Sequence, residues 1–82
     1  MQTELRQSDF IRFHGQRKYI FELMADGQWR TLEEIAKSCN ASEAGASARL
    51  RDFRKQAYGG FTVRRRRVSG TNIYEYQLDL AD

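Results

Sequence analysis

The glycine pair at positions 59 and 60 separates two different patterns of apolar residues. Before the pair, Ala46, Leu50, Phe53 and Ala57 recur at spacings of four, three and four, which is typical of one face of an α-helix. After the pair, the apolar period changes to two, as in a half-buried strand. The sequence therefore predicts a helix over residues 42–56, a break at the glycines and a β-hairpin over residues 61–78.

The predicted hairpin has a register that satisfies many cross-strand pairs at once. A turn at residues 70–71 places residues whose numbers sum to 141 opposite each other, which pairs Phe61 with Leu80, Val63 with Leu78, Arg65 with Tyr76, Arg66 with Glu75 and Arg67 with Tyr74. Because successive side chains point to opposite faces of a strand, we expect arginines 65 and 67 to stack on the two tyrosine rings. Arginines 64 and 66 then point the other way, with residue 66 beside Glu75.

The N-terminal half predicts one helix and a short extended link. Close to helical spacing lie Phe10, Phe13, Arg17, Ile20, Leu23 and Met24. We expect a helix over residues 16–25, an extension from near Phe10 that is capped by Ser8 or Asp9, and an end at Gly27. Residues 28–30 form a brief strand or link, with Trp29 in the core.

A second helix is predicted from a capping box at residues 31–34, in which Thr31 and Glu34 bond each other's backbone amide. This helix ends near Cys39, and Asn40 can take the left-handed conformation of a turn. Ser42 then caps the helix over residues 42–56. Two short helices joined by such a turn make a helix-turn-helix.

The predicted order of helix, short strand, two helices and two strands is that of an α+β winged helix-turn-helix. Its most telling pieces are Ala-Asp-Gly-Gln-Trp-Arg-Thr-Leu-Glu-Glu-Ile-Ala at 25–36, Ser-Ala-Arg-Leu-Arg-Asp-Phe-Arg-Lys at 47–55 and Tyr-Glu-Tyr-Gln-Leu at 74–78. On these pieces, residues 17–78 resemble the winged-helix domains of small bacteriophage and bacterial proteins. The resemblance implies that the second helix of the pair binds DNA and that the hairpin is a wing touching the backbone or minor groove.

The 82 residues are enough for one small domain, and we expect a polar arm over residues 1–9 and the winged-helix domain over residues 10–80. No apolar run approaches the ~20 residues of a membrane span, and the N-terminus lacks a signal-peptide pattern. The single Cys39 cannot form an internal disulfide. We therefore expect a cytoplasmic protein with no membrane partner.

Positive charge is concentrated in one stretch. Residues 49–67 hold eight basic residues and one acid, whereas the rest of the chain holds six basic and ten acidic residues. Such a basic stretch is typical of a polyanion-binding surface, for which nucleic acid is the commonest partner. The alternative is a solvated edge strand that charge protects from aggregation.

The helix over residues 42–56 carries small and basic side chains opposite its apolar stripe. Ser47 can donate to a phosphate or a base edge, and Arg51 or Arg49 can reach guanine in bidentate fashion. Small residues are also ordinary surface residues, so this assignment is a hypothesis. The residues expected to bind DNA are Ser42, Ala44, Gly45, Ser47, Ala48, Arg49, Arg51, Arg54, Lys55, Arg64, Arg65, Arg66 and Arg67.

The sequence offers no catalytic pattern, metal site or cofactor motif, because one histidine and one cysteine do not supply three or four clustered ligands. We therefore expect a non-enzymatic protein that binds double-stranded DNA as a phage or bacterial regulator or accessory factor, for example in transcription regulation. One alternative is a winged helix that forms a homodimer or docks on a protein partner. Another is sequence-independent binding of RNA or single strands by stacking on Tyr74 and Tyr76.

Overall fold

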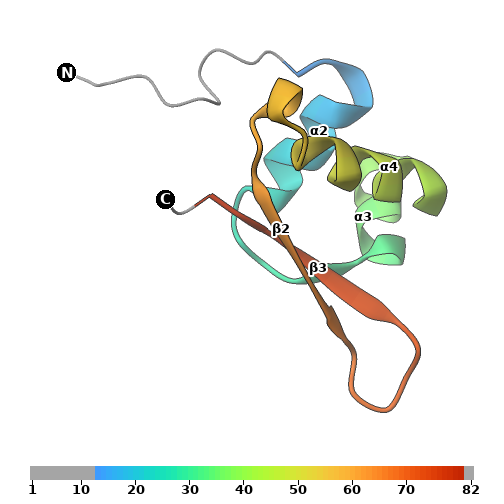
Figure 1. Cartoon of the computed structure of the whole chain (residues 1–82). Helices are drawn as coiled ribbons and strands as arrows, with labels where there is room; N and C mark the ends of the chain where they lie inside the picture. The colour runs from blue at the N-terminus through green and yellow to red at the C-terminus, as the bar shows by residue number, and fades with distance from the viewer. Residues whose placement is uncertain (1–12, 81–82) are drawn as a thin grey trace.

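Three α-helices and a three-stranded antiparallel sheet build the part of the chain that the computed structural model describes, residues 13–80. In chain order the elements are α2 (Gly15–Met24), β1 (Arg30–Thr31), α3 (Leu32–Cys39), α4 (Glu43–Phe53), the 3-10 helix η1 (Gln56–Tyr58), β2 (Thr62–Arg67) and β3 (Tyr74–Asp79). The hairpin of β2 and β3 extends away from the helices (Figure 1). The fold class is α+β. Phe10 and the predicted cap at residues 8–9 lie outside the described residues. His14 is extended, with φ of −128° and ψ of 153°, so the prediction of a helical extension before residue 16 is wrong at residues 13 and 14.

Local capping bonds define the helix pair as predicted. The Thr31 hydroxyl accepts a bond of 3.1 Å from the Glu34 amide, and the Glu34 carboxylate accepts one of 2.8 Å from the Thr31 amide. Asn40 ends α3 in the left-handed conformation, with φ of 53°. The Ser42 hydroxyl then accepts a bond of 2.9 Å from the Gly45 amide at the start of α4. The turn between the helices is therefore fixed at both ends by short-range hydrogen bonds.

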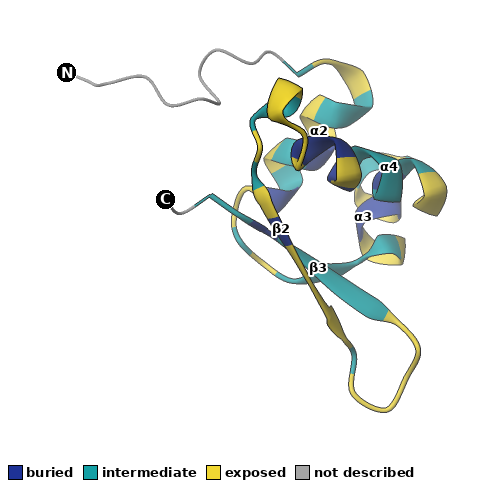
Figure 2. Ribbon diagram, viewed as in Figure 1, coloured by how far each residue is buried: buried dark blue, intermediate teal, exposed yellow. Residues whose placement is uncertain are grey.

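The core lies where the three helices meet the base of the hairpin, the dark blue segments in Figure 2. Its buried members are Ile20, Met24, Ile35, Ala46, Leu50, Phe53, Val63 and Leu78. Phe53 is fully buried, and its ring lies edge-on to those of Phe13 and Phe21 at 5.3 and 5.5 Å between centroids. The helices therefore pack on one another and on the hairpin base through a single apolar cluster.

The sheet order is β1-β3-β2, and the predicted hairpin register is confirmed. The six cross-strand pairs run from Thr62 opposite Asp79 to Arg67 opposite Tyr74. Gly70 has φ of 78° in the connecting loop, and the Val68 amide closes the loop with a bond of 2.7 Å to the Ile73 carbonyl. Because the register alternates faces, Arg65 shares a face with the buried Val63, and Arg64 lies on the other.

The helix predicted over residues 42–56 ends early, at Phe53. Lys55 is extended, with ψ of 144°, and the chain continues into η1, where Ala57 is exposed. The prediction that Ala57 continues the apolar stripe of α4 is therefore wrong. The amide of Phe61 instead donates to the Phe53 carbonyl over 2.8 Å, so the chain turns back at the end of α4.

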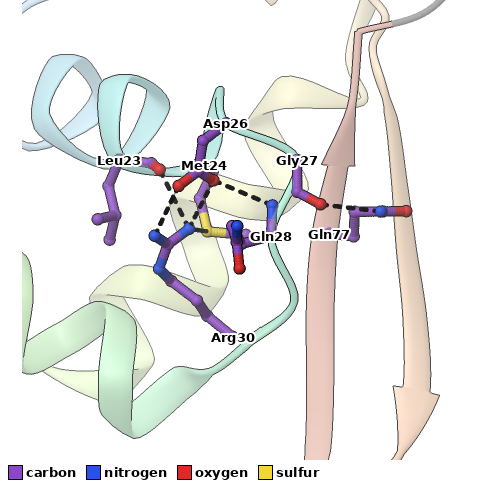
Figure 3. A network of polar contacts seen from close by, with 7 residues as sticks. All are labelled: Leu23, Met24, Asp26, Gly27, Gln28, Arg30 and Gln77. Atoms are coloured by element: carbon purple, nitrogen blue, oxygen red, sulfur yellow. Dashed lines mark hydrogen bonds and ion pairs between the residues drawn. The ribbon is translucent and has the colours of Figure 1, made fainter.

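Trp29 is half-buried and lies outside the core cluster, so its prediction as a core residue is wrong. In the β1–β3 register Arg30 pairs with Tyr76, which places Trp29, one residue earlier, on the opposite face of the sheet. Arg30, and not Trp29, lies against the C-terminal end of α2. Its guanidinium bonds both carboxylate oxygens of Asp26 at 2.9 Å and the Leu23 carbonyl at 3.1 Å (Figure 3).

Candidate nucleic-acid interface

The side chains of α4 fall into four stripes, as the helical period requires. Ala46, Leu50 and Phe53 are buried in the core. One flank, formed by Ser47, Arg51 and Arg54, faces the hairpin, because these residues line a hollow together with Arg65. The other flank, formed by Gly45, Arg49 and Asp52, faces α2, because Gln16 and Arg17 contact it. Ala44 and Ala48 occupy the stripe between the two flanks.

The hollow between α4 and the inner face of the hairpin is the candidate interface. It has a volume of about 370 Å³ and is lined by Ser47, Leu50, Arg51, Arg54, Arg65 and Tyr76. We call it the α4–hairpin groove. Three arginines therefore approach one concave surface from two different elements.

Two of these arginines are held in place by neighbours other than carboxylates. The Arg54 guanidinium donates to the carbonyl of Val63 over 2.8 Å, which joins the end of α4 to the edge strand β2. The guanidinium carbon of Arg65 lies 4.5 Å from the centre of the Tyr74 ring. Arg65 thus stacks on its diagonal neighbour, because a long side chain can lean along the strand. The expected stacking of Arg65 on Tyr76 and of Arg67 on Tyr74 is wrong, since within residues 13–80 Arg65, and not Arg67, lies over the Tyr74 ring. Within residues 13–80, neither Arg51 nor Arg67 has an ion pair.

The outer face of the hairpin has a different electrostatic character. Arg64 pairs with Asp79 at 2.8 Å, and Arg66 pairs with Glu75 at 2.9 Å, as predicted for the second pair. The Arg66 guanidinium also lies 4.1 Å from the centre of the Trp29 ring. Among the described residues, the run of four arginines therefore divides into two that pair with carboxylates, Arg64 and Arg66, and two that do not, Arg65 and Arg67.

Asp52 forms a cluster with three cations on the α2 flank of α4. One oxygen, Oδ2, accepts bonds of 2.9 Å from the Nε atoms of both Arg17 and Arg49, and Oδ1 lies 3.3 Å from Nζ of Lys55. Burial of Asp52 opposes ionisation, but hydrogen bonds from Lys55 and Arg17 and the nearby arginine charges outweigh it and lower the pKa of the carboxyl. Arg49 and Lys55, both expected to bind DNA, are therefore anchored to this carboxylate.

Sequence reasoning missed the role of Arg17 and Asp52. The spacing of Arg49 and Asp52 by three residues on one helix indicates a local ion pair, and this signal was available in the sequence. The contact from Arg17 crosses 35 residues and depends on how α2 packs on α4. Three other residues predicted to bind DNA lie near the start and middle of α4. Ala44 is exposed and Ala48 is half-buried. Ser42 is exposed and serves as the α4 cap.

A second hollow of about 380 Å³ continues beyond Tyr76 toward the start of the helix pair. It is lined by Thr31, Leu32, Glu33, Glu43, Asn72, Ile73, Tyr74 and Tyr76. This part of the concave face contains two carboxylates and the exposed Ile73 in place of arginines. The positive surface is therefore confined to the half of the concavity beside the second half of α4.

Within residues 13–80, no group of three or more histidine, cysteine, aspartate or glutamate side chains could hold a metal ion. None of the helices in this part of the chain has the length and apolar content needed to cross a lipid bilayer.

In comparisons with known proteins, no family model, curated protein or solved structure matches the chain. Its function is therefore inferred from the geometry and charge of its own residues.

Proposed function

We propose that this chain is a winged-helix domain that binds double-stranded DNA, with α4 in the major groove and the hairpin as a wing on the phosphate backbone. Such a domain would serve as a phage or bacterial regulator or accessory factor. The observation that carries the proposal is the convergence of cations without a carboxylate partner on the α4–hairpin groove.

A census of the basic residues in the described part of the chain supports this convergence. Seven of them pair with carboxylates, namely Arg17, Arg30, Lys37, Arg49, Lys55, Arg64 and Arg66. The five without such a pair within residues 13–80 are Lys18, Arg51, Arg54, Arg65 and Arg67. Three of these five, Arg51, Arg54 and Arg65, line the groove. Arg67 follows Arg65 by two positions on β2, so both point to the same face of the hairpin. Uncompensated charge on a concave surface raises the local concentration of a polyanion.

The shape of the surface supports a duplex partner. Ala44 and Ala48 allow the backbone of α4 to come close to bases, and Ser47 and Arg51 lie beside them on the flank that faces the wing. An α-helix fits the major groove, and its N-terminal half usually contacts the base edges. The arginines of the hairpin then lie beside the phosphates of one strand, where they position the domain without reading sequence.

Single-strand binding by base stacking fits the geometry less well. Tyr74 and Tyr76 are both half-buried, and the guanidinium of Arg65 covers the Tyr74 ring. Stacking platforms for single strands require exposed aromatic faces. Duplex DNA is therefore the partner that the arrangement of side chains favours.

The test is a titration of duplex binding at several salt concentrations, with the Arg65→Ala, Arg67→Ala double variant and a matched control. Each phosphate contact contributes about −0.9 to the slope of log K against log salt. The double variant should flatten the slope by roughly two units and weaken a selected duplex and a scrambled duplex alike. The Arg64→Ala, Arg66→Ala control removes the same charge from the opposite face of the same strand and should change the slope much less.

Three results would contradict the proposal in different ways. Equal slope changes in the two double variants would mean that net charge alone drives binding. An unchanged slope in the Arg65→Ala, Arg67→Ala variant would assign these arginines to solubility of an edge strand. Tighter binding of RNA or single-stranded DNA than of duplex at matched salt would replace the duplex as the partner.

A further inference from the structure

The Asp52 cluster carries more positive charge than its carboxylate neutralises. Arg17, Arg49 and Lys55 contact the single carboxylate of Asp52, so the four side chains together hold two excess positive charges. Within residues 13–80, the pairs of Arg30 with Asp26, Lys37 with Glu33 and Arg66 with Glu75 each contain one cation for one acid. The cluster therefore differs from the ordinary ion pairs that neutralise the rest of the surface.

The cluster lies on the flank of α4 opposite the groove. Arg49 and Asp52 belong to the stripe that faces α2, and Arg17 reaches the cluster from α2 itself. Arg51 and Arg54 belong to the stripe that faces the hairpin. Between the two basic flanks, α4 presents the small side chains of Ala44 and Ala48.

A helix with this cross-section can reach both strands of a duplex. The major groove of B-DNA is about 12 Å wide, and an α-helix with its side chains is about 10–12 Å across. A helix lying in the groove therefore has one flank beside the phosphates of each strand. The hairpin arginines occupy one flank of α4, and the Asp52 cluster occupies the other.

We infer that Arg17, Arg49 and Lys55 form a second phosphate-binding site, which contacts the DNA strand opposite the one that the hairpin contacts. Asp52 acts as the positioning residue of this site. The inference rests on the proposed binding of duplex DNA and extends it from one strand to both. It also assigns Arg49 to a phosphate, in place of the guanine contact considered from the sequence.

The geometry around Asp52 favours preorganisation of the cations over their sequestration. Both arginines use Nε for the carboxylate, which leaves terminal guanidinium nitrogens for a further acceptor. One terminal nitrogen of Arg49 lies 3.4 Å from the Gln16 side-chain oxygen, and Arg17 stacks on the Tyr58 ring at 4.5 Å. The side chains of Arg17, Arg49 and Lys55 stay 31%, 26% and 58% exposed. Cations that are already ordered lose less conformational entropy when they bind.

The experiment compares Arg49→Gln and Lys55→Gln with an Arg64→Gln control, using duplexes labelled on either strand. Because three cations share Asp52, removing one leaves the carboxylate paired, and a thermal melt checks that each variant folds. Each of the two test variants should flatten the salt slope by about 0.9. Phosphate-ethylation interference on the parent protein should map contacts to both strands across one major groove, and the variants should lose them on one strand only.

The inference is overturned if the parent shows interference on a single strand, or if both test variants fold and keep the parental slope. In either case the cluster only pins α2 to α4. These results are distinguishable from failure of the proposed function, which shows as an unaltered slope in the Arg65→Ala, Arg67→Ala variant. Lys55→Gln is decisive if Arg49→Gln does not fold, since Lys55 is the most exposed of the three cations.

Discussion

Replacing Phe53 with alanine should remove about half or more of the stability of the domain. The side chain is fully buried and packs edge-on against Phe13 and Phe21. Truncation of a buried phenylalanine costs about 3–5 kcal/mol, and two lost ring pairs place this site toward the upper end. A chain of 82 residues holds roughly 4–12 kcal/mol in total.

Urea unfolding followed by circular dichroism measures this loss. Phe53→Leu provides a graded variant that should stay folded and lose roughly 1–2 kcal/mol, because it keeps most of the volume and loses the ring contacts. Tyr19→Ala is the matched control, since this aromatic side chain is 57% exposed on α2. The control should change the free energy of unfolding by less than about 0.5 kcal/mol.

The reasoning is refuted if Phe53→Ala unfolds at the parental urea concentration. If Phe53→Ala kept the parental free energy of unfolding but no longer bound duplex DNA, Phe53 would be a DNA-contact residue and not a core residue. Equal losses for Phe53→Ala and Tyr19→Ala would mean that the aromatic cluster does not hold the helices together.

Three further changes test other parts of the structure. Arg51→Ala should cost about 1–3 kcal/mol on a selected duplex and relax preference at one base pair, and an unaltered profile in a randomised-site assay would exclude base reading. Thr31→Ala should lower the free energy of unfolding by about 1 kcal/mol through loss of the capping box, measured by urea unfolding. Because the folded pKa of Asp52 is lowered, its stabilisation is present above about pH 4 and is lost as the pH falls through the folded pKa. Urea midpoints measured against pH should therefore fall less steeply on acidification in Asp52→Asn than in the parent. The acid sensitivity that remains in this variant includes the contribution of Asp26, whose pKa the hydrogen bond from Arg30 lowers to about 2.

Features set by residues close in sequence could be predicted from the sequence. The capping box at Thr31, the left-handed Asn40 and the Ser42 cap involve neighbours within four positions. The hairpin register followed because one turn position aligns Val63 with Leu78 and Arg66 with Glu75 together. A one-residue slip would have moved both pairs to the wrong face.

Features that depend on packing between distant elements could not be predicted in the same way. The face on which Trp29 lies is set by the pairing of Arg30 with Tyr76, which no local pattern indicates. The end of α4 at Phe53 carries no glycine or proline, so periodicity alone extended the helix to Ala57. The same distinction applies to the candidate site. The ion pair of Arg49 with Asp52 joins residues three positions apart and could have been predicted from the sequence. The ion pair of Arg17 with Asp52 depends on how α2 packs on α4 and could not.

On the proposed binding mode, the placement of acids, rather than the number of arginines, decides which cations of this domain are available to contact a phosphate. Glu75 and Asp79 lie four residues apart on β3, so both point to the outer face, where the register sets them opposite Arg66 and beside Arg64. Arg65 and Arg67 point to the inner face, which carries tyrosines in place of acids. On the proposed binding mode, the four consecutive arginines would therefore supply two phosphate contacts. A slope change of roughly two units, not four, is the expected signature of the hairpin. The same rule makes Asp52 exceptional, because an acid that gathers three cations concentrates positive charge where a single pair would cancel it.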